Sequence, residues 1–163
     1  MQIKVFNKTS VASYHPKRNL FRKPLLIRIM DDSGWTNYPE MPNIHKYKAV
    51  HVMNFLDVEV DINDIERQEL YGKDLLTDDD IEELIKFLEV FLDRSISEIV
   101  IHCDEGRRRS VSVALFIASR FLKDKLLVSF IEENYGKPYN NPRGNPMITK
   151  QLEDYYDNHY KKK

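Results

Sequence analysis

The feature that most constrains this chain is a junction near its middle, where a short apolar segment is followed by a polar loop and then a long apolar segment. Glu98–His102 is rich in Ile and Val and predicts a buried central strand. Arg108–Leu122 is apolar almost all round, which is typical of a buried helix. Between them lies His102-Cys-Asp-Glu-Gly-Arg-Arg-Arg-Ser110. A tight loop that enters a helix directs several backbone N–H groups at one point, so we expect an anion-binding loop here.

Strands and helices alternate along the rest of the chain. Apolar runs predict strands over Ile3–Phe6, Pro24–Met30 and Ala49–Phe55. Helical spacing predicts a helix capped by Thr77, and two further helices near Asp124–Tyr135 and Pro146–Tyr156. Gly-, Pro- and Asn-rich loops are expected over Asp31–Pro42 and Gly136–Asn145. The alternation predicts an α/β fold with a central, mostly parallel sheet flanked by helices.

Length and composition favour one soluble domain. The 163 residues suit a single domain over 1–163, with residues 160–163 as a frayed basic tail. A formal net charge of −1 gives no global basic field, so we expect no nucleic-acid partner. No apolar run approaches the about 20 residues of a membrane helix, so no membrane span is predicted. No long heptad pattern demands a partner, and a monomer is expected.

The chain holds a single cysteine, Cys103, which cannot form an internal disulfide. This usage, together with an N-terminus that lacks a signal-peptide pattern, predicts a cytoplasmic protein. A lone thiol is more often an inert core residue than a nucleophile. The position of Cys103 reverses that preference, because helix N-termini and nearby cations stabilise a thiolate.

Three other residues of the loop have side chains or backbones suited to an anion. Arg109 lies six positions after Cys103 and can hold two phosphate oxygens with its planar guanidinium. Gly106 permits the backbone conformation that such a loop needs. Ser110 can hydrogen-bond the sulfur of Cys103, or it can simply be a serine in the first turn of a helix.

The pattern His-Cys-x-x-Gly-x-x-Arg-Ser resembles the signature loop of the protein tyrosine phosphatase superfamily, in its small, dual-specificity-like branch of compact bacterial and viral members. The order of the other segments is also similar, over roughly Gln2 to Tyr156. The resemblance implies a phosphatase-like fold with the phosphate-binding loop between a strand and a buried helix. It also implies hydrolysis of a phosphomonoester through a cysteinyl-phosphate intermediate, without a metal or another cofactor.

The resemblance assigns a role to each residue of the loop. It implies that Cys103 attacks phosphorus, that Arg109 stabilises the transferred charge, that Ser110 assists departure of the sulfur, and that His102 supports the cysteine from behind. The remaining phosphate-binding candidates are Asp104, Glu105, Gly106, Arg107 and Arg108. We expect the two carboxylates to point outward and pair with surface arginines, since facing the phosphate they would repel it.

The general acid must come from an upstream loop. The resemblance favours Asp57, in a Phe-x-Asp segment that follows the Ala49–Phe55 strand. Asp61, Asp64 and Asp74 remain alternatives, and each is otherwise a solvated loop carboxylate. Outside this set, Trp35 and Tyr38 are candidates to flank the site, and Asn145 is a candidate to place a water or to cap a helix.

These observations predict a tyrosine or dual-specificity protein phosphatase that acts on a phosphorylated protein or another phosphomonoester. Two alternatives stay open. Arg107 and Arg108 favour a phosphatase for a polyanionic small molecule, such as a phosphoinositide or a polyphosphate. Because the acid is not assigned, a catalytically dead module that only binds phosphoproteins also stays open, although the intact Cys103, Arg109 and Ser110 argue against it.

Overall fold

The computed structural model describes residues 1–16, 21–31, 38–58, 75–135 and 144–160. Asp61, Asp64 and Asp74, the alternatives to Asp57, lie outside these residues, as does Trp35.

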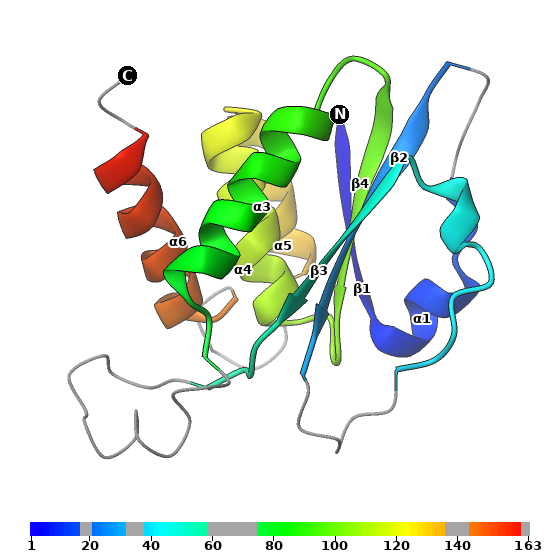
Figure 1. Cartoon of the computed structure of the whole chain (residues 1–163), viewed down its shortest axis with the longest axis horizontal. Helices are drawn as coiled ribbons and strands as arrows, with labels where there is room; N and C mark the ends of the chain where they lie inside the picture. The colour runs from blue at the N-terminus through cyan, green and yellow to red at the C-terminus, as the bar shows by residue number, and fades with distance from the viewer. Residues whose placement is uncertain (17–20, 32–37, 59–74, 136–143, 161–163) are drawn as a thin grey trace.

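The described strands form one parallel sheet (Figure 1). They are β1 (Gln2–Asn7), β2 (Lys23–Met30), β3 (Ala49–Asn54) and β4 (Ile96–Cys103), and they lie in the order β1-β4-β2-β3. β4 is an inner strand, with Val5 and Ile27 opposite Ile101 on its two neighbours. Because the strands run in the same direction, their carboxyl ends meet at one edge of the sheet. The α/β prediction with a parallel sheet is confirmed.

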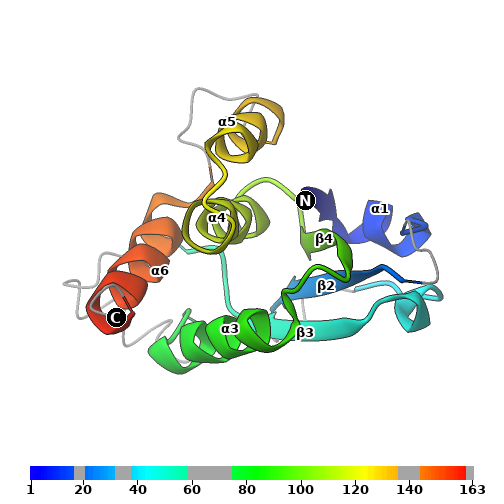
Figure 2. The ribbon, with the colours of Figure 1, turned by 90° about the horizontal axis from the view of Figure 1, so that it is seen from above.

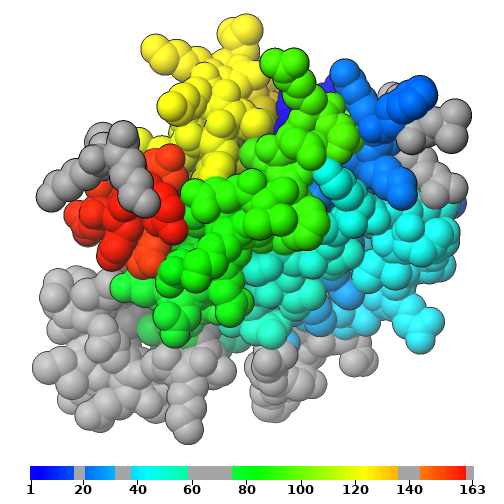
Figure 3. Space-filling model, turned by 45° about the horizontal axis from the view of Figure 1, so that its top comes forward, coloured from blue at the N-terminus to red at the C-terminus, as the bar shows by residue number. Residues whose placement is uncertain are grey.

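One face of the sheet is covered by helices (Figure 2). They are α3 (Asp78–Phe91), α4 (Arg109–Phe116) with its π-helical continuation η2 (Ile117–Phe121), α5 (Lys125–Asn134) and α6 (Pro146–His159). α4 is buried on nearly every side, as its apolar sequence predicts. In the space-filling view the side chains of α3, α5 and α6 form a continuous outer layer (Figure 3).

Side chains at the helix ends fix where these helices begin and stop. Thr77 and Asp80 form a capping box at α3, in which each side chain accepts from the other residue's backbone N–H. The predicted helix Arg108–Leu122 changes to π-helical hydrogen bonding at Ile117, whose carbonyl accepts from the N–H of Leu122 at 3.1 Å. Lys123 then adopts a left-handed conformation, with φ of 50°, and ends the helix.

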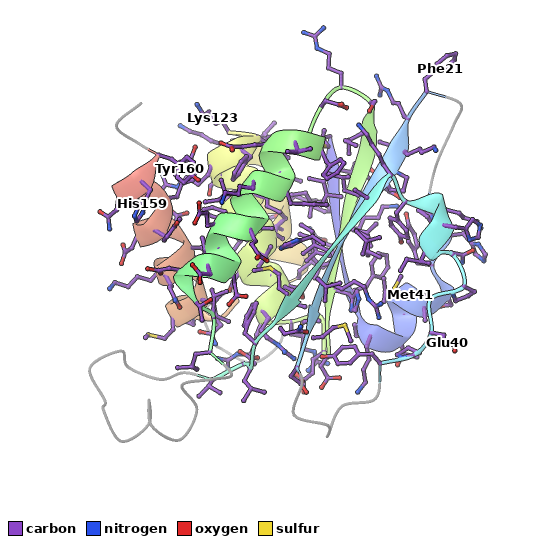
Figure 4. The ribbon with its side chains drawn as sticks, in the orientation of Figure 1. Phe21, Glu40, Met41, Lys123, His159 and Tyr160 are labelled. Atoms are coloured by element: carbon purple, nitrogen blue, oxygen red, sulfur yellow. The ribbon has the colours of Figure 1, made fainter. Side chains whose placement is uncertain are left out.

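The opposite face carries two elements that the sequence pattern did not predict, α1 (Lys8–Ser13) and the 3₁₀ turn η1 (Ile44–Lys46). They cover a second, smaller apolar cluster. Its buried members are Val11, Leu26, Met41, Tyr47 and Val100. Met41 lies beside α1 in Figure 4. No helix within the described part of the chain is long and apolar enough to span a membrane.

Candidate functional site

The predicted anion-binding loop lies at the carboxyl edge of the sheet, between the last residue of β4, Cys103, and the first residue of α4, Arg109. The thiol is buried, with 2% of the residue exposed. The N–H of Gly106 donates to Cys103 Sγ at 3.2 Å, and Ser110 Oγ lies 3.0 Å from the same sulfur. The sulfur therefore faces two polar groups, as sequence reasoning expected for Ser110.

The loop rests against the end of β1. Gly106 has a φ of +71°, and a Cβ built there would lie 2.6 Å from the backbone nitrogen of Asn7 and 2.6 Å from the carbonyl carbon of Phe6. Neither the conformation nor the contact admits a side chain. The conformational role predicted for this glycine thus has a second cause, the close approach of β1.

The side chain of Arg109 is buried, with 5% of its surface exposed. Its Nη1 donates to the carbonyl of Phe55 at 2.7 Å, and its Nη2 lies 3.7 Å from Oδ2 of Asp31, whose side chain is 7% exposed. These partners follow β3 and β2, so the guanidinium joins the carboxyl ends of two strands to the start of α4. Asp31 is a residue of the site that the sequence reasoning missed, since it was read only as part of a turn-rich loop.

Asp57 lies beside the loop but is held by two neighbours. Asn145 Nδ2 donates to its Oδ1 at 2.8 Å, and Arg108 Nε lies 3.3 Å from its Oδ2. Asn145 also caps α6 through Oδ1, and its backbone exchanges hydrogen bonds with Ser112 Oγ of α4. The structure therefore brings Asp57, Arg108 and Asn145 together as a link between β3, α4 and α6.

His102 is buried beneath the loop, with 1% of the residue exposed. Its Nε2 accepts a hydrogen bond from Arg28 Nε at 3.2 Å. Burial, together with the charges of Arg28 and Arg109, lowers the pKa of His102 to about 4, so the imidazole is neutral at neutral pH. The described structure therefore connects His102 to β2, an arrangement that the sequence did not reveal.

The carboxylate of Asp104 points outward, as expected, but its partner is a lysine rather than an arginine. Lys8 Nζ lies 2.6 Å from Asp104 Oδ1, and the backbone N–H of Lys8 donates to the Asp104 carbonyl at 3.1 Å. These contacts fasten α1 to the loop. Glu105 and Arg107 are exposed on its outer side. Within the described ranges no three His, Cys, Asp or Glu side chains are grouped to hold a metal ion.

The fold resembles that of a solved structure, the human tyrosine phosphatase-like serine/threonine/tyrosine-interacting protein. The match has a TM-score of 0.50 and 14% sequence identity, and it covers 84% of this chain and 78% of the other. It supports the phosphatase-like fold and nothing about chemistry, because identity is so low. No curated protein sequence matches the chain.

The family comparison corrects the predicted function. Residues 67–153, a little over half of the chain and including the entire loop, match the family described as the Rit1 DUSP-like domain. That family is named for initiator tRNA phosphoribosyl transfer, not for phosphate-ester hydrolysis. Assignment to the protein tyrosine phosphatase superfamily was therefore wrong, and so were the predicted phosphatase activities and the protein or small-molecule phosphomonoester substrates.

The same finding bears on two other predictions. The catalytically dead phosphoprotein-binding module has no support from this family. The absence of a nucleic-acid partner was inferred from net charge alone, and it conflicts with a family named for tRNA. Nine residues of a loop were sufficient to predict the fold, but not the reaction. By its match over residues 67–153, the chain belongs to the Rit1 DUSP-like domain family.

Proposed function

We propose that this chain acts in phosphoribosyl transfer to tRNA, and that its loop from Cys103 to Ser110 binds the phosphate of the ribosyl-phosphate group. In such a transfer the bond from ribose C1 to the diphosphate breaks and a bond from C1 to a tRNA hydroxyl oxygen forms, while the hydroxyl proton leaves. The phosphate monoester on the transferred ribose does not react. A loop that only holds this group is therefore sufficient for the role proposed.

The observation that carries the proposal is that the family match includes this loop complete with Arg109. The first turn of α4 contains no acidic residue, and its N-cap residue, Arg108, makes no side-chain capping hydrogen bond. The positive end of the helix dipole is thus not offset locally by a carboxylate on the helix. A phosphate dianion suits such a helix start better than a neutral ligand does.

Binding of RNA by a chain with a net charge of −1 has to use local cations. Arg107 is exposed and Arg108 is partly exposed on the outer side of the loop, next to the buried Arg109. We propose that Arg107 contacts the tRNA backbone while Arg109 supports the ribosyl phosphate. The sequence left open whether Arg107 and Arg108 bind a second anionic group, and we propose RNA as that group.

Three predicted roles have no step in this transfer, because the phosphate held by the loop does not react: the nucleophilic role of Cys103, the acid role of Asp57 and the assisting role of Ser110. The single domain, the monomer and the cytoplasmic location stay predictions. The phosphate-binding roles of Asp104 and Glu105 can involve only their backbone N–H groups, because Asp104 is paired with Lys8 and Glu105 faces solvent.

The test measures binding of unmodified initiator tRNA by fluorescence anisotropy and of ribose 5-phosphate by calorimetry. Arg109→Met is compared with Arg94→Met, a matched control because Arg94 is exposed and precedes β4 at the opposite edge of the sheet. We expect Arg109→Met to lower the affinity for both ligands about 10- to 100-fold, because loss of a charged hydrogen-bond donor costs about 1.5–3 kcal/mol. The control leaves both affinities unchanged.

Because Arg109 is buried, thermal unfolding must first show that each variant is folded, and Arg109→Lys serves as the conservative alternative. The proposal would be wrong if the folded wild-type protein bound no tRNA. Equal affinities in the Arg109 variants and the control would also remove it.

A further inference from the structure

Three side chains on the α1 side of the sheet lie next to the loop, and the proposed function gives none of them a ligand to bind. They are Lys8 from α1, Arg28 from β2 and Tyr38, and we refer to them as the α1-side cluster. Their neighbour in the sheet is the buried His102.

Three short distances connect the cluster into one surface. The Tyr38 ring centre lies 6.2 Å from that of His102, and Lys8 Nζ lies 5.8 Å from the Tyr38 ring centre. Arg28 Nε donates to His102 Nε2 at 3.2 Å. Since Lys8 also contacts Asp104 of the loop, the cluster and the phosphate-binding loop share a border.

The sheet register extends this surface toward the edge strand. Arg28 lies opposite His102 on β4 and opposite Val52 on β3. Val52 is 45% exposed, and Arg28 is partly exposed. At this row the α1 face of the sheet therefore carries a partly exposed arginine and an exposed aliphatic side chain, with the Tyr38 ring near His102.

The charges on this surface favour an anion. Lys8 is offset by Asp104, whereas among the residues that the structure describes Arg28 donates to a neutral imidazole, which brings no negative charge. Tyr38 is a neutral donor, since burial raises its pKa to about 12, and its hydroxyl lies 3.4 Å from Asp31 Oδ2. That contact holds the ring of Tyr38 in place relative to Arg109, which pairs with the same carboxylate.

From this geometry we infer that the α1-side cluster is a nucleotide subsite, in which the Tyr38 ring stacks on an RNA base and Arg28 binds the adjoining backbone phosphate. The inference rests on the proposed function and names where the RNA lies relative to the phosphate-binding loop. Aromatic rings beside cations are the usual means of holding unstacked bases. Arginine suits the position because its guanidinium binds phosphate and also stacks on π-faces.

The test compares two probes that differ in whether they carry bases. One is a single-stranded RNA oligonucleotide of tRNA sequence containing 2-aminopurine, whose fluorescence falls when the base stacks. The other is ribose 5-phosphate, which has no base. The variants are Tyr38→Leu, Tyr38→Phe and Arg28→Met, with Phe21→Leu as control because Phe21 is 85% exposed at the far end of β2 (Figure 4).

We expect Tyr38→Leu to raise the ratio of the RNA Kd to the ribose 5-phosphate Kd about 5- to 100-fold and to abolish the fluorescence quench. Tyr38→Phe keeps the ring and therefore keeps the quench. Arg28→Met lowers the affinity for the RNA. It also makes the plot of log affinity against log salt concentration less steep by about 0.7, the value for one phosphate contact on a single strand. Phe21→Leu leaves the binding of both probes unchanged.

The outcomes separate this inference from the proposed function. If Tyr38→Leu weakens both probes equally, Tyr38 acts only by holding Asp31 and Arg109, and the subsite is wrong. If RNA binding depends on Arg109 but not on Tyr38 or Arg28, the subsite fails while the proposed function stands. If wild-type protein binds ribose 5-phosphate but no RNA, both fail.

Discussion

The two faces of the sheet are built differently, and the difference lies in how much apolar and how much polar contact each face makes. On the helix face, α3, α4, α5 and α6 enclose a continuous apolar cluster that includes Phe116 and Leu84. On the α1 face the apolar cluster is small, and polar contacts surround it. Tyr14 donates to Glu98 Oε1 at 2.8 Å, and Lys4 Nζ lies 3.1 Å from Glu98 Oε2.

Polar contacts of this kind position groups more than they add net stability. Glu98 is 2% exposed, and removing a carboxylate from water costs free energy that its ion pair only partly recovers. What the contacts do provide is a fixed place for the end of α1. The other end of α1 carries Lys8, which is bound to the loop at Asp104. The apolar core on the helix face thus contributes most of the stability, while the polar contacts on the α1 face fix the positions of charged side chains around the loop.

The largest effect expected from this comparison is on the helix face. Phe116 is fully buried, so Phe116→Ala should lower the free energy of unfolding by about 3–5 kcal/mol. Urea unfolding measures the change, with Phe130→Ala on the exposed side of α5 as control. RNA affinity should be unchanged at temperatures where the variant is folded. A large loss of affinity in the folded variant would show that the two faces are not separable.

The next effect concerns the loop where it touches β1. Gly106→Ala places a Cβ against backbone atoms and forces a left-handed alanine, so we expect a loss of about 2–5 kcal/mol together with loss of phosphate binding. Gly144→Ala is the matched comparison, because Gly144 also has a positive φ but its closest neighbour is the side chain of Ser112. The measured loss should be smaller there. Equal losses would mean that β1 does not support the loop.

A pH effect should come from His102. Its folded-state pKa is near 4 while the ordinary value is 6.5, so between these values the unfolded chain binds a proton that the folded chain does not. Stability is therefore complete above pH 6.5 and falls by about 2–3 kcal/mol as the pH approaches 4. Urea midpoints from pH 7 to pH 4.5 test this, and His102→Gln should flatten the profile relative to His45→Gln. If the stability of His102→Gln depends on pH as that of the wild type does, another group causes the loss of stability at low pH.

The smallest effect should be at the polar network of the α1 face. Tyr14→Phe removes a hydroxyl that donates to Glu98 and accepts from Lys4, at a cost of about 1–2 kcal/mol. Hydrogen exchange should show faster opening of α1 than of α3. Tyr160→Phe, which keeps a ring stacked on Tyr156, is the control. Slowed or unaltered exchange in α1 would contradict the positioning role given to this network.

Most regular elements could be predicted because their signals are local. The strands are Ile- and Val-rich runs, and Thr77 with Asp80 marks the start of α3 in the sequence itself. α1 escaped detection because six residues hold less than two turns and show no period; its one local signal is Asn7, whose side chain caps it. The contacts that complete the site join residues far apart in the chain, such as Asp57 with Asn145 and Arg28 with His102. No pattern within a window of sequence reveals such pairs.

The functional error has a different physical cause. Cys103, Gly106, Arg109 and Ser110 lie together at a strand–helix junction, an arrangement that suits an anion whatever reaction follows. The loop residues therefore predict only what kind of ligand can bind, because the reaction depends on groups elsewhere that decide which bond breaks. The prediction of no nucleic-acid partner was wrong for a related reason. It used the net charge of the whole chain, which contains no information on where cations such as Arg28 and Arg107 lie.

The contact between Gly106 and the end of β1 has a consequence for what counts as the smallest autonomous unit of this protein. The stretch that matches the family begins at residue 67, after β1, β2 and β3 have ended. A fragment starting there would keep β4 but lose the strands on both of its sides, leaving two unpaired hydrogen-bonding edges that invite aggregation. The boundary at which relatedness is detected and the boundary at which the chain can fold by itself are therefore different places in the sequence.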